Sequence, residues 1–213
     1  MKKDIRTHEA DINLVKKFLD YAECADASYA LLEVVKGKFK DVDNEGKEVE
    51  VKGDTQTLGS TYFNKDTNTN QNSTYARAIE ARFNEEKIND WCLPLTDKCL
   101  LTKDKIPNND ITKITLDSKL SNRTIKFTNR FRILAHQKNT SSGFSATLFE
   151  DTEDNNQKIF AIRGTEFPSG FSNDVLDSDA NLALSSLPSN QYIDMIKFYT
   201  QCIADKYIAE STP

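Results

Sequence analysis

The sequence predicts an α/β fold, a sheet with flanking helices, and two observations lead to it. Two apolar runs, Phe144–Phe149 and Ile159–Ile162, flank a polar turn rich in Asp and Asn, which is the pattern of a β-hairpin. Apolar residues also recur at helical spacing near both ends of the chain, over Asp11–Val35 and after Pro188. A sheet with helices from the two ends of the chain on its faces would bury both patterns.

The apolar run Ile159–Ile162 is expected to be the central strand of this sheet. All four of its residues are apolar, and a strand that is covered on both faces has such a composition. The run leads directly into Arg163, Gly164 and Thr165. Because α/β proteins place ligand-facing groups at the ends of central strands, a site is expected at this step.

The first part of the chain predicts a helix and then a hairpin. Asp11–Val35 has the helical spacing, and Gly37 is a suitable stop signal. Lys38–Lys52 is predicted to be a peripheral hairpin with its turn at Asn44-Glu45-Gly46.

The next segments are more polar. Gly53–Asn72 is predicted to be a flexible polar loop, after which Ser73 or Thr74 can cap a helix over Tyr75–Lys87. We interpret residues 37–122 as an inserted α+β cap region on one domain that comprises residues 1–213.

Three further segments complete the order of elements. Asn89–Asp110 is expected to be a lid-like loop, and Ile111–Leu120 fits a strand or a helix equally. Arg123–Ala135 alternates between apolar and polar residues and predicts a strand. Pro188 suits the first turn of the last helix. The apolar stripe of that helix is expected to comprise Tyr192, Met195, Ile196, Tyr199, Ile203 and Tyr207.

Composition and charge exclude few classes of protein. A net charge of −5 and a pI of about 5.2 argue against nonspecific binding of nucleic acid, which needs a basic surface. No run approaches the ~18 apolar residues of a membrane span. The N-terminus has no uninterrupted apolar region after its lysines, so we expect a cytoplasmic protein, or one exported without a Sec signal peptide.

The four cysteines do not have the C-x-x-C spacing of a metal site. Cys24 and Cys202 lie within apolar helical patterns and are expected to be small core residues. Cys92 and Cys99 are close enough in sequence to form a disulfide in an oxidising compartment, although reduced thiols in a cytoplasm are the expected state.

Four segments resemble the N-terminal half of class 3 lipases, which are α/β-hydrolases. "AIRGTE" at 161–166 is similar to that family's strand ending in Arg-Gly-Thr or Arg-Gly-Ser, and "NDVLDSDANLAL" at 173–184 to the acidic segment after it. "YAECADASYALL" at 21–32 resembles the family's entry helix, and "FRILAHQKNTSSGFSATLF" at 131–149 the preceding hairpin. The resemblance therefore implies an incomplete α/β-hydrolase-like sheet.

The resemblance also implies a role for Thr165, and its neighbours are expected to support that role. Thr165 would lie on the oxyanion loop, where its backbone N–H and hydroxyl face the negative charge of the tetrahedral intermediate. The alternative is an ordinary Thr at the end of a strand. Arg163 would support the loop, together with Gly164, through bidentate pairing with Asp174, Asp177 or Asp179. We expect no metal at these aspartates, since their spacing is not that of a calcium loop.

The family's Gly-X-Ser-X-Gly nucleophile motif does not occur in these 213 residues. Its catalytic Asp and His would follow that motif. Ser141, Ser142 and Ser145 are therefore expected to be turn residues, and His136 an ordinary His at a strand end.

The resulting hypothesis is the N-terminal portion of a lipase- or phospholipase-like serine ester hydrolase, inactive alone. It would act on an ester or lipid substrate once completed by a C-terminal half, without a cofactor, and self-associate through an open sheet edge. The alternatives are a non-catalytic lipid- or protein-binding module derived from a lipase fold, and an α/β domain whose resemblance is accidental.

Overall fold

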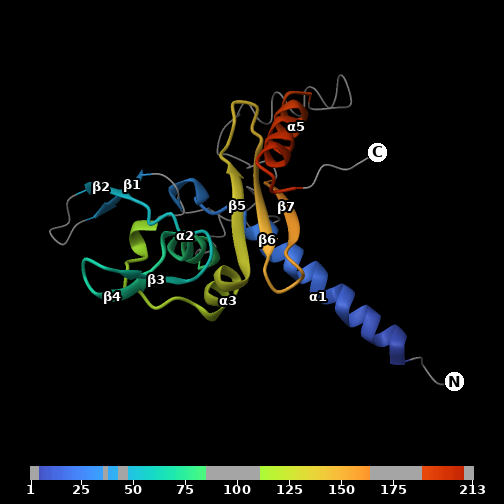
Figure 1. The fold of residues 1–213 in the computed structure, drawn as a ribbon, viewed down its shortest axis with the longest axis horizontal. Coiled ribbons are helices and arrows are strands. Elements are labelled where there is room, and N and C mark those ends of the chain that lie inside the picture. Colours follow the sequence, from blue (N-terminus) through green and yellow to red (C-terminus); the bar gives the residue numbers. More distant parts are fainter. Residues whose placement is uncertain (1–4, 36–37, 43–47, 85–110, 164–188, 209–213) are drawn as a thin grey trace, which may run out of the picture. The chain divides into compact units, whose positions relative to one another are not determined.

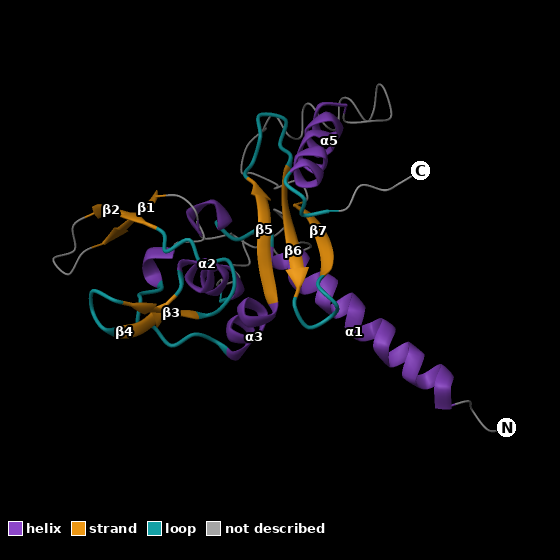
Figure 2. Ribbon diagram, in the orientation of Figure 1, coloured by secondary structure: helices purple, strands orange, loops and turns teal. Residues whose placement is uncertain are grey.

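The computed structural model describes residues 5–35, 38–42, 48–84, 111–163 and 189–208. These residues form helices and small antiparallel sheets, a composition compatible with the α/β class (Figures 1 and 2). The chain divides into two compact units, of which the first comprises residues 1–29 and 131–213 and the second residues 30–130. The segment 37–122 lies within the second unit; its role as a cap stays a prediction.

The first unit is built on a three-stranded antiparallel sheet. Its strands are β5 (Phe131–Gln137), β6 (Ser145–Asp151) and β7 (Gln157–Arg163), in the order β5-β6-β7. The predicted hairpin between the two apolar runs is thereby confirmed. Its turn contains Asn155 and Asn156, both with positive φ, which Asn tolerates better than most residues.

The prediction that Ile159–Ile162 forms the central strand is wrong for the sheet that the described residues form. All residues of β6 are buried, whereas β7 is the outer strand and Ile162 is 48% exposed. Polar residues in β6 did not prevent burial, because the Ser145 hydroxyl donates a 2.9 Å hydrogen bond to the Gln137 carbonyl. Within the run only Ala161 is buried, so its continuous apolar composition indicates neither full cover on both faces nor a neighbouring strand on both edges.

A charge ladder crosses the sheet at Glu150 of β6. Its carboxylate accepts a 2.9 Å hydrogen bond from Arg132 Nη1 on β5 and pairs with Lys158 Nζ on β7. Cross-strand pairs of opposite charge stabilise the register of a sheet.

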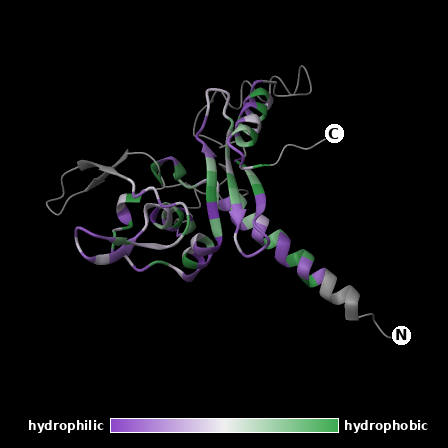
Figure 3. Cartoon of the chain, in the orientation of Figure 1, coloured by the Kyte–Doolittle hydropathy of each residue, from purple (hydrophilic) through white to green (hydrophobic). Residues whose placement is uncertain are grey.

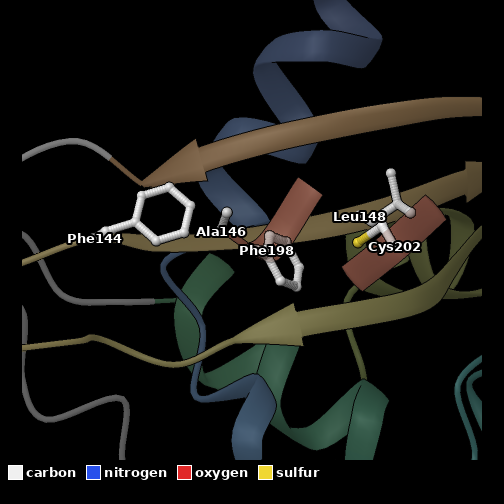
Figure 4. Packing of buried hydrophobic residues seen from close by; sticks show 5 residues of the cluster. All are labelled: Phe144, Ala146, Leu148, Phe198 and Cys202. Carbon is white, nitrogen blue, oxygen red and sulfur yellow. The ribbon is translucent and has the colours of Figure 1, made fainter. Parts of the chain in front are cut away.

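Helix α5 (Ser189–Ala204) covers one face of the sheet. Phe198 and Cys202 pack against three buried residues of the β6 region, and the rings of Phe144 and Phe198 lie 6.3 Å apart between centroids (Figure 4). The predicted helix is confirmed, but its predicted apolar stripe is partly wrong. Tyr192, Ile196 and Tyr199 are exposed, because the buried face is centred on Phe198 and Cys202.

Helix α1 (Ile5–Ala27) packs its C-terminal end against β7, and Figure 1 shows the rest of it continuing beyond the sheet. It begins at Ile5 rather than Asp11 and ends at Ala27 rather than Val35. The end of the helix is fixed by the turn that follows it. The Ser28 N–H donates to the Cys24 carbonyl and the Tyr29 N–H to the Asp26 carbonyl. Cys24 and Ala27 are fully buried, so the prediction of core cysteines is confirmed for Cys24, as it is for Cys202.

The second unit contains two hairpins, of which the sequence predicted one. β1 (Lys38–Val42) pairs with β2 (Glu48–Lys52), as predicted. β3 (Thr61–Asn64) pairs with β4 (Thr69–Asn72) inside the segment predicted to be a loop. Side-chain hydrogen bonds reinforce this polar hairpin, because Tyr62 and Asn64 both donate to Gln71 Oε1, at 3.2 and 2.8 Å.

Helix α2 (Thr74–Phe83) forms the core of the second unit with η1 (Leu32–Val35), η2 (Ile111–Lys113) and α3 (Asn122–Arg130). The predicted cap is confirmed at Ser73, whose hydroxyl accepts a 3.0 Å hydrogen bond from the Ala76 N–H. α3 corrects the predicted strand Arg123–Ala135, of which only the C-terminal part, in β5, is extended.

Candidate functional site

Most residues of the predicted oxyanion loop lie outside the described residues. This applies to Gly164 and Thr165, and to the acidic residues Asp174 and Asp177 that were expected to support them. Their roles stay predictions, as does the reduced state of Cys92 and Cys99, which also lie outside the described residues. The candidate site is therefore defined by its described edge, which is the end of β7.

Arg163 is the last residue of β7 and contacts an aromatic ring. Its guanidinium carbon lies 5.3 Å from the centroid of the Tyr29 ring. At this distance, the ring quadrupole attracts the cation, by about 0.5–1 kcal/mol where the pair is partly solvated. The contact connects the end of β7 to the turn after α1, the helix that packs on the same strand.

The sequence did not predict Tyr29 as a contact of Arg163. It indicated aspartates, because a guanidinium fork suits a carboxylate, and those aspartates lie beyond the described ranges. A signal was nevertheless present. Tyr29 belongs to "YAECADASYALL" and Arg163 to "AIRGTE", so the contact joins two of the segments that carry the resemblance.

A second polar cluster connects the turn before β6 to α5. The Ser142 hydroxyl donates a 2.8 Å hydrogen bond to Asp194 Oδ2, and Lys197 Nζ lies 3.1 Å from Asp194 Oδ1. The Ser142 bond and, after it, the Lys197 bond lower the pKa of Asp194. Ser142 is 7% exposed and is a turn residue, as predicted. Nothing in the spacing of these residues indicated that Asp194 would be its acceptor.

The remaining candidate nucleophile and base have other partners. His136 Nδ1 shares a 2.9 Å hydrogen bond with the Thr147 hydroxyl, and Ser145 donates to the Gln137 carbonyl. His136 lies within β5, one residue before its end. The described hydroxyl that shares a hydrogen bond with His136 Nδ1 is thus that of a threonine.

A metal-binding cluster and a membrane-spanning helix are both absent from the described residues. Within these ranges, no group of three or more His, Cys, Asp or Glu residues could hold a metal ion. Among the helices of the described residues, none has the length and apolar composition needed to cross a membrane.

Comparisons of the chain with known protein families, with curated proteins and with solved structures found no match.

Proposed function

We propose that this chain is the N-terminal portion of a lipase- or phospholipase-like serine ester hydrolase with an incomplete α/β-hydrolase fold. The observation that carries the proposal is the Arg163-Gly164-Thr165 sequence, which begins at the last residue of β7, in a segment that resembles class 3 lipases. The contact between Arg163 and Tyr29 supports it, because it joins two segments of that resemblance.

The proposed chemistry is acyl transfer. A Ser attacks the ester carbonyl, a His accepts its proton, and an Asp orients the His. Thr165 would donate hydrogen bonds to the oxyanion, and Arg163 would hold the strand end from which the loop departs. The Ser and His must come from a segment other than these 213 residues, which contain no Gly-X-Ser-X-Gly motif.

The first test is to read the coding DNA beyond Pro213 in all three frames. A frame that continues with a short apolar strand and Gly-X-Ser-X-Gly supports the proposal, and the rejoined protein should then hydrolyse p-nitrophenyl esters. Thr165→Val in that protein should lower kcat by about 100- to 1,000-fold, the usual effect of losing one oxyanion donor. Thr165→Ser, which keeps the hydroxyl, is the matched control.

The alternative function is a non-catalytic module that binds lipid or protein. The observation that favours it is the exposed apolar face on α1. Absence of any nucleophile motif in the flanking DNA, with no hydrolysis by the chain itself, would support this module over the hydrolase.

A further inference from the structure

The described part of α1 has an apolar face that the described residues of its own unit leave largely uncovered. Residues 11–19 are all exposed, and Figure 3 shows hydrophobic and hydrophilic positions alternating along this helix. The large apolar side chains of this face are Ile12 (42% exposed), Leu14 (54%), Val15 (66%), Phe18 (61%), Leu19 (60%) and Tyr21 (36%).

The part of this face within residues 11–19 is exposed, whereas the Tyr21 hydroxyl accepts a 3.1 Å hydrogen bond from Gln157 Nε2 of β7. The residues by which α1 is buried are Cys24 and Ala27, at its C-terminal end. With 3.6 residues per turn, Cys24 lies almost on the opposite side of the helix from Val15 and Leu19, whereas Ala27 lies about a quarter to a third of a turn away from them.

We propose that α1 is a self-association site and that a second copy of this chain covers its apolar face. The exposed apolar area supports a second copy. Without Tyr21, which contacts β7, the five large side chains, each roughly half exposed, present on the order of 500 Å² per copy. Two copies would then bury on the order of 1,000 Å², the smallest area expected of a specific protein interface.

Sequence spacing and charge also fit a second copy. Ile12, Val15 and Leu19 have the 3-4 spacing of a coiled-coil seam. In a parallel pair, a flanking residue faces the residue five positions later in the other helix. Asp11 of one copy would therefore face Lys16 of the second copy, and the same pair would form twice.

The charge of the helix disfavours a lipid surface as the occupant. Residues 11–27 contain two basic residues, Lys16 and Lys17, and four acidic residues. Amphipathic helices that lie on anionic membranes are rich in Lys and Arg on their polar face. An acidic helix would be repelled by such a membrane.

The test is sedimentation equilibrium of the whole chain over a 100-fold dilution range, with circular dichroism as the check on folding. The unmodified chain should dimerise in a concentration-dependent manner, and Leu19→Glu should remain monomeric with unchanged helix content. Asn13→Glu is the matched control, because it adds the same charge on the side of the helix where Cys24 lies. That variant should dimerise like the unmodified chain.

A charge exchange tests the orientation of the pair. Asp11→Lys and Lys16→Asp should each raise the dissociation constant of the dimer by about 5-fold, and the double variant should restore it. A chain that is monomeric throughout would overturn the proposal, whether or not it binds vesicles containing anionic lipid. A dimer that persists in Leu19→Glu would also overturn it, because contact would then be made elsewhere, for example at the β7 edge.

Discussion

The Ser142 hydroxyl and the Asp194 carboxylate are 52 residues apart in sequence and joined by a 2.8 Å hydrogen bond. The bond fixes the turn between β5 and β6 to α5. Ser142 is buried, whereas the Asp194 side chain is 22% exposed and also pairs with Lys197. A charged acceptor makes this bond stronger than one between neutral groups.

The first prediction concerns the pH dependence of this bond. The pKa of Asp194 is lowered from 3.8 in the folded protein, chiefly by Ser142, so the folded state favours the ionised carboxylate. Its contribution to stability is complete above pH 3.8, and is lost as the pH falls through the lower folded pKa. Ser142→Ala should cost about 1–2 kcal/mol in the free energy of unfolding at neutral pH.

Urea unfolding at a series of pH values measures this cost. The difference between Ser142→Ala and the unmodified protein should shrink as Asp194 becomes protonated. Ser141→Ala, at the exposed neighbouring position, should have almost no effect at any pH. A Ser142→Ala cost that did not change on acidification would contradict the assignment of the bond to the ionised form.

The second prediction concerns Glu80, a carboxylate that is 2% exposed in α2. It accepts hydrogen bonds from both the backbone N–H and the hydroxyl of Ser121, at 2.9 and 2.8 Å, at the start of α3. Glu80→Ala should destabilise the protein by about 2–3 kcal/mol, because the Ser121 donors lose a buried acceptor. Glu80→Gln keeps one acceptor oxygen and the side-chain volume, so its loss should be smaller. Equal unfolding midpoints in urea for the two variants would refute this role.

The same contact explains why the strand predicted over Arg123–Ala135 begins as a helix in the structure. Ile125 and Phe127 alternate with polar residues, which is a local strand pattern. In the structure, Ser121 caps a helix there, with its hydroxyl accepting from the Thr124 N–H at 3.2 Å. Glu80 accepts hydrogen bonds from Ser121 and lies 41 residues earlier in the chain. The residue that stabilises this helix start is therefore too far away to appear in the local sequence pattern.

Other elements were predictable to the extent that their determinants are local. The hairpin of β6 and β7 and the cap at Ser73 depend on neighbouring residues, and both were predicted correctly. The polar hairpin of β3 and β4 was missed, because amide side chains rather than apolar alternation reinforce it. At the candidate site, Arg163 was predicted but its contact with Tyr29 was not, since the two residues are distant in sequence.

The third prediction concerns Gly53, where the backbone of the second unit approaches another segment closely. A Cβ atom at this position would contact the Val34 carbonyl oxygen and lie 2.9 Å from that of Val35. Both contacts are with backbone, which cannot rotate away as a side chain could. Gly53→Ala should therefore cost about 1–3 kcal/mol through overpacking.

Hydrogen exchange can assign this effect to a unit. Gly53→Ala should accelerate exchange in η1 and α2 of the second unit. Gly143→Ala is the comparison, because Gly143 has φ of 84° and lies in the first unit, where the added strain should act on the turn before β6. Unchanged exchange in η1 after Gly53→Ala would show that the backbone at Gly53 can move away from Val34 and Val35 without loss of stability.

The fourth prediction concerns the thiol of Cys202, which packs between α5 and the sheet in Figure 4. The side chain is 1% exposed, and burial, followed by the Asp205 carboxylate, raises the pKa of the thiol. Because the thiolate is the reactive form, Cys202 should react with iodoacetamide at least 100-fold more slowly in the native protein than in urea. Peptide mapping by mass spectrometry separates its labelling from that of the other cysteines.

A cysteine introduced by Gln201→Cys, at the exposed neighbouring position, should be labelled rapidly in the same sample. Equally rapid labelling of Cys202 would mean that α5 leaves the sheet often, and that the core cluster contributes little to the stability of the first unit.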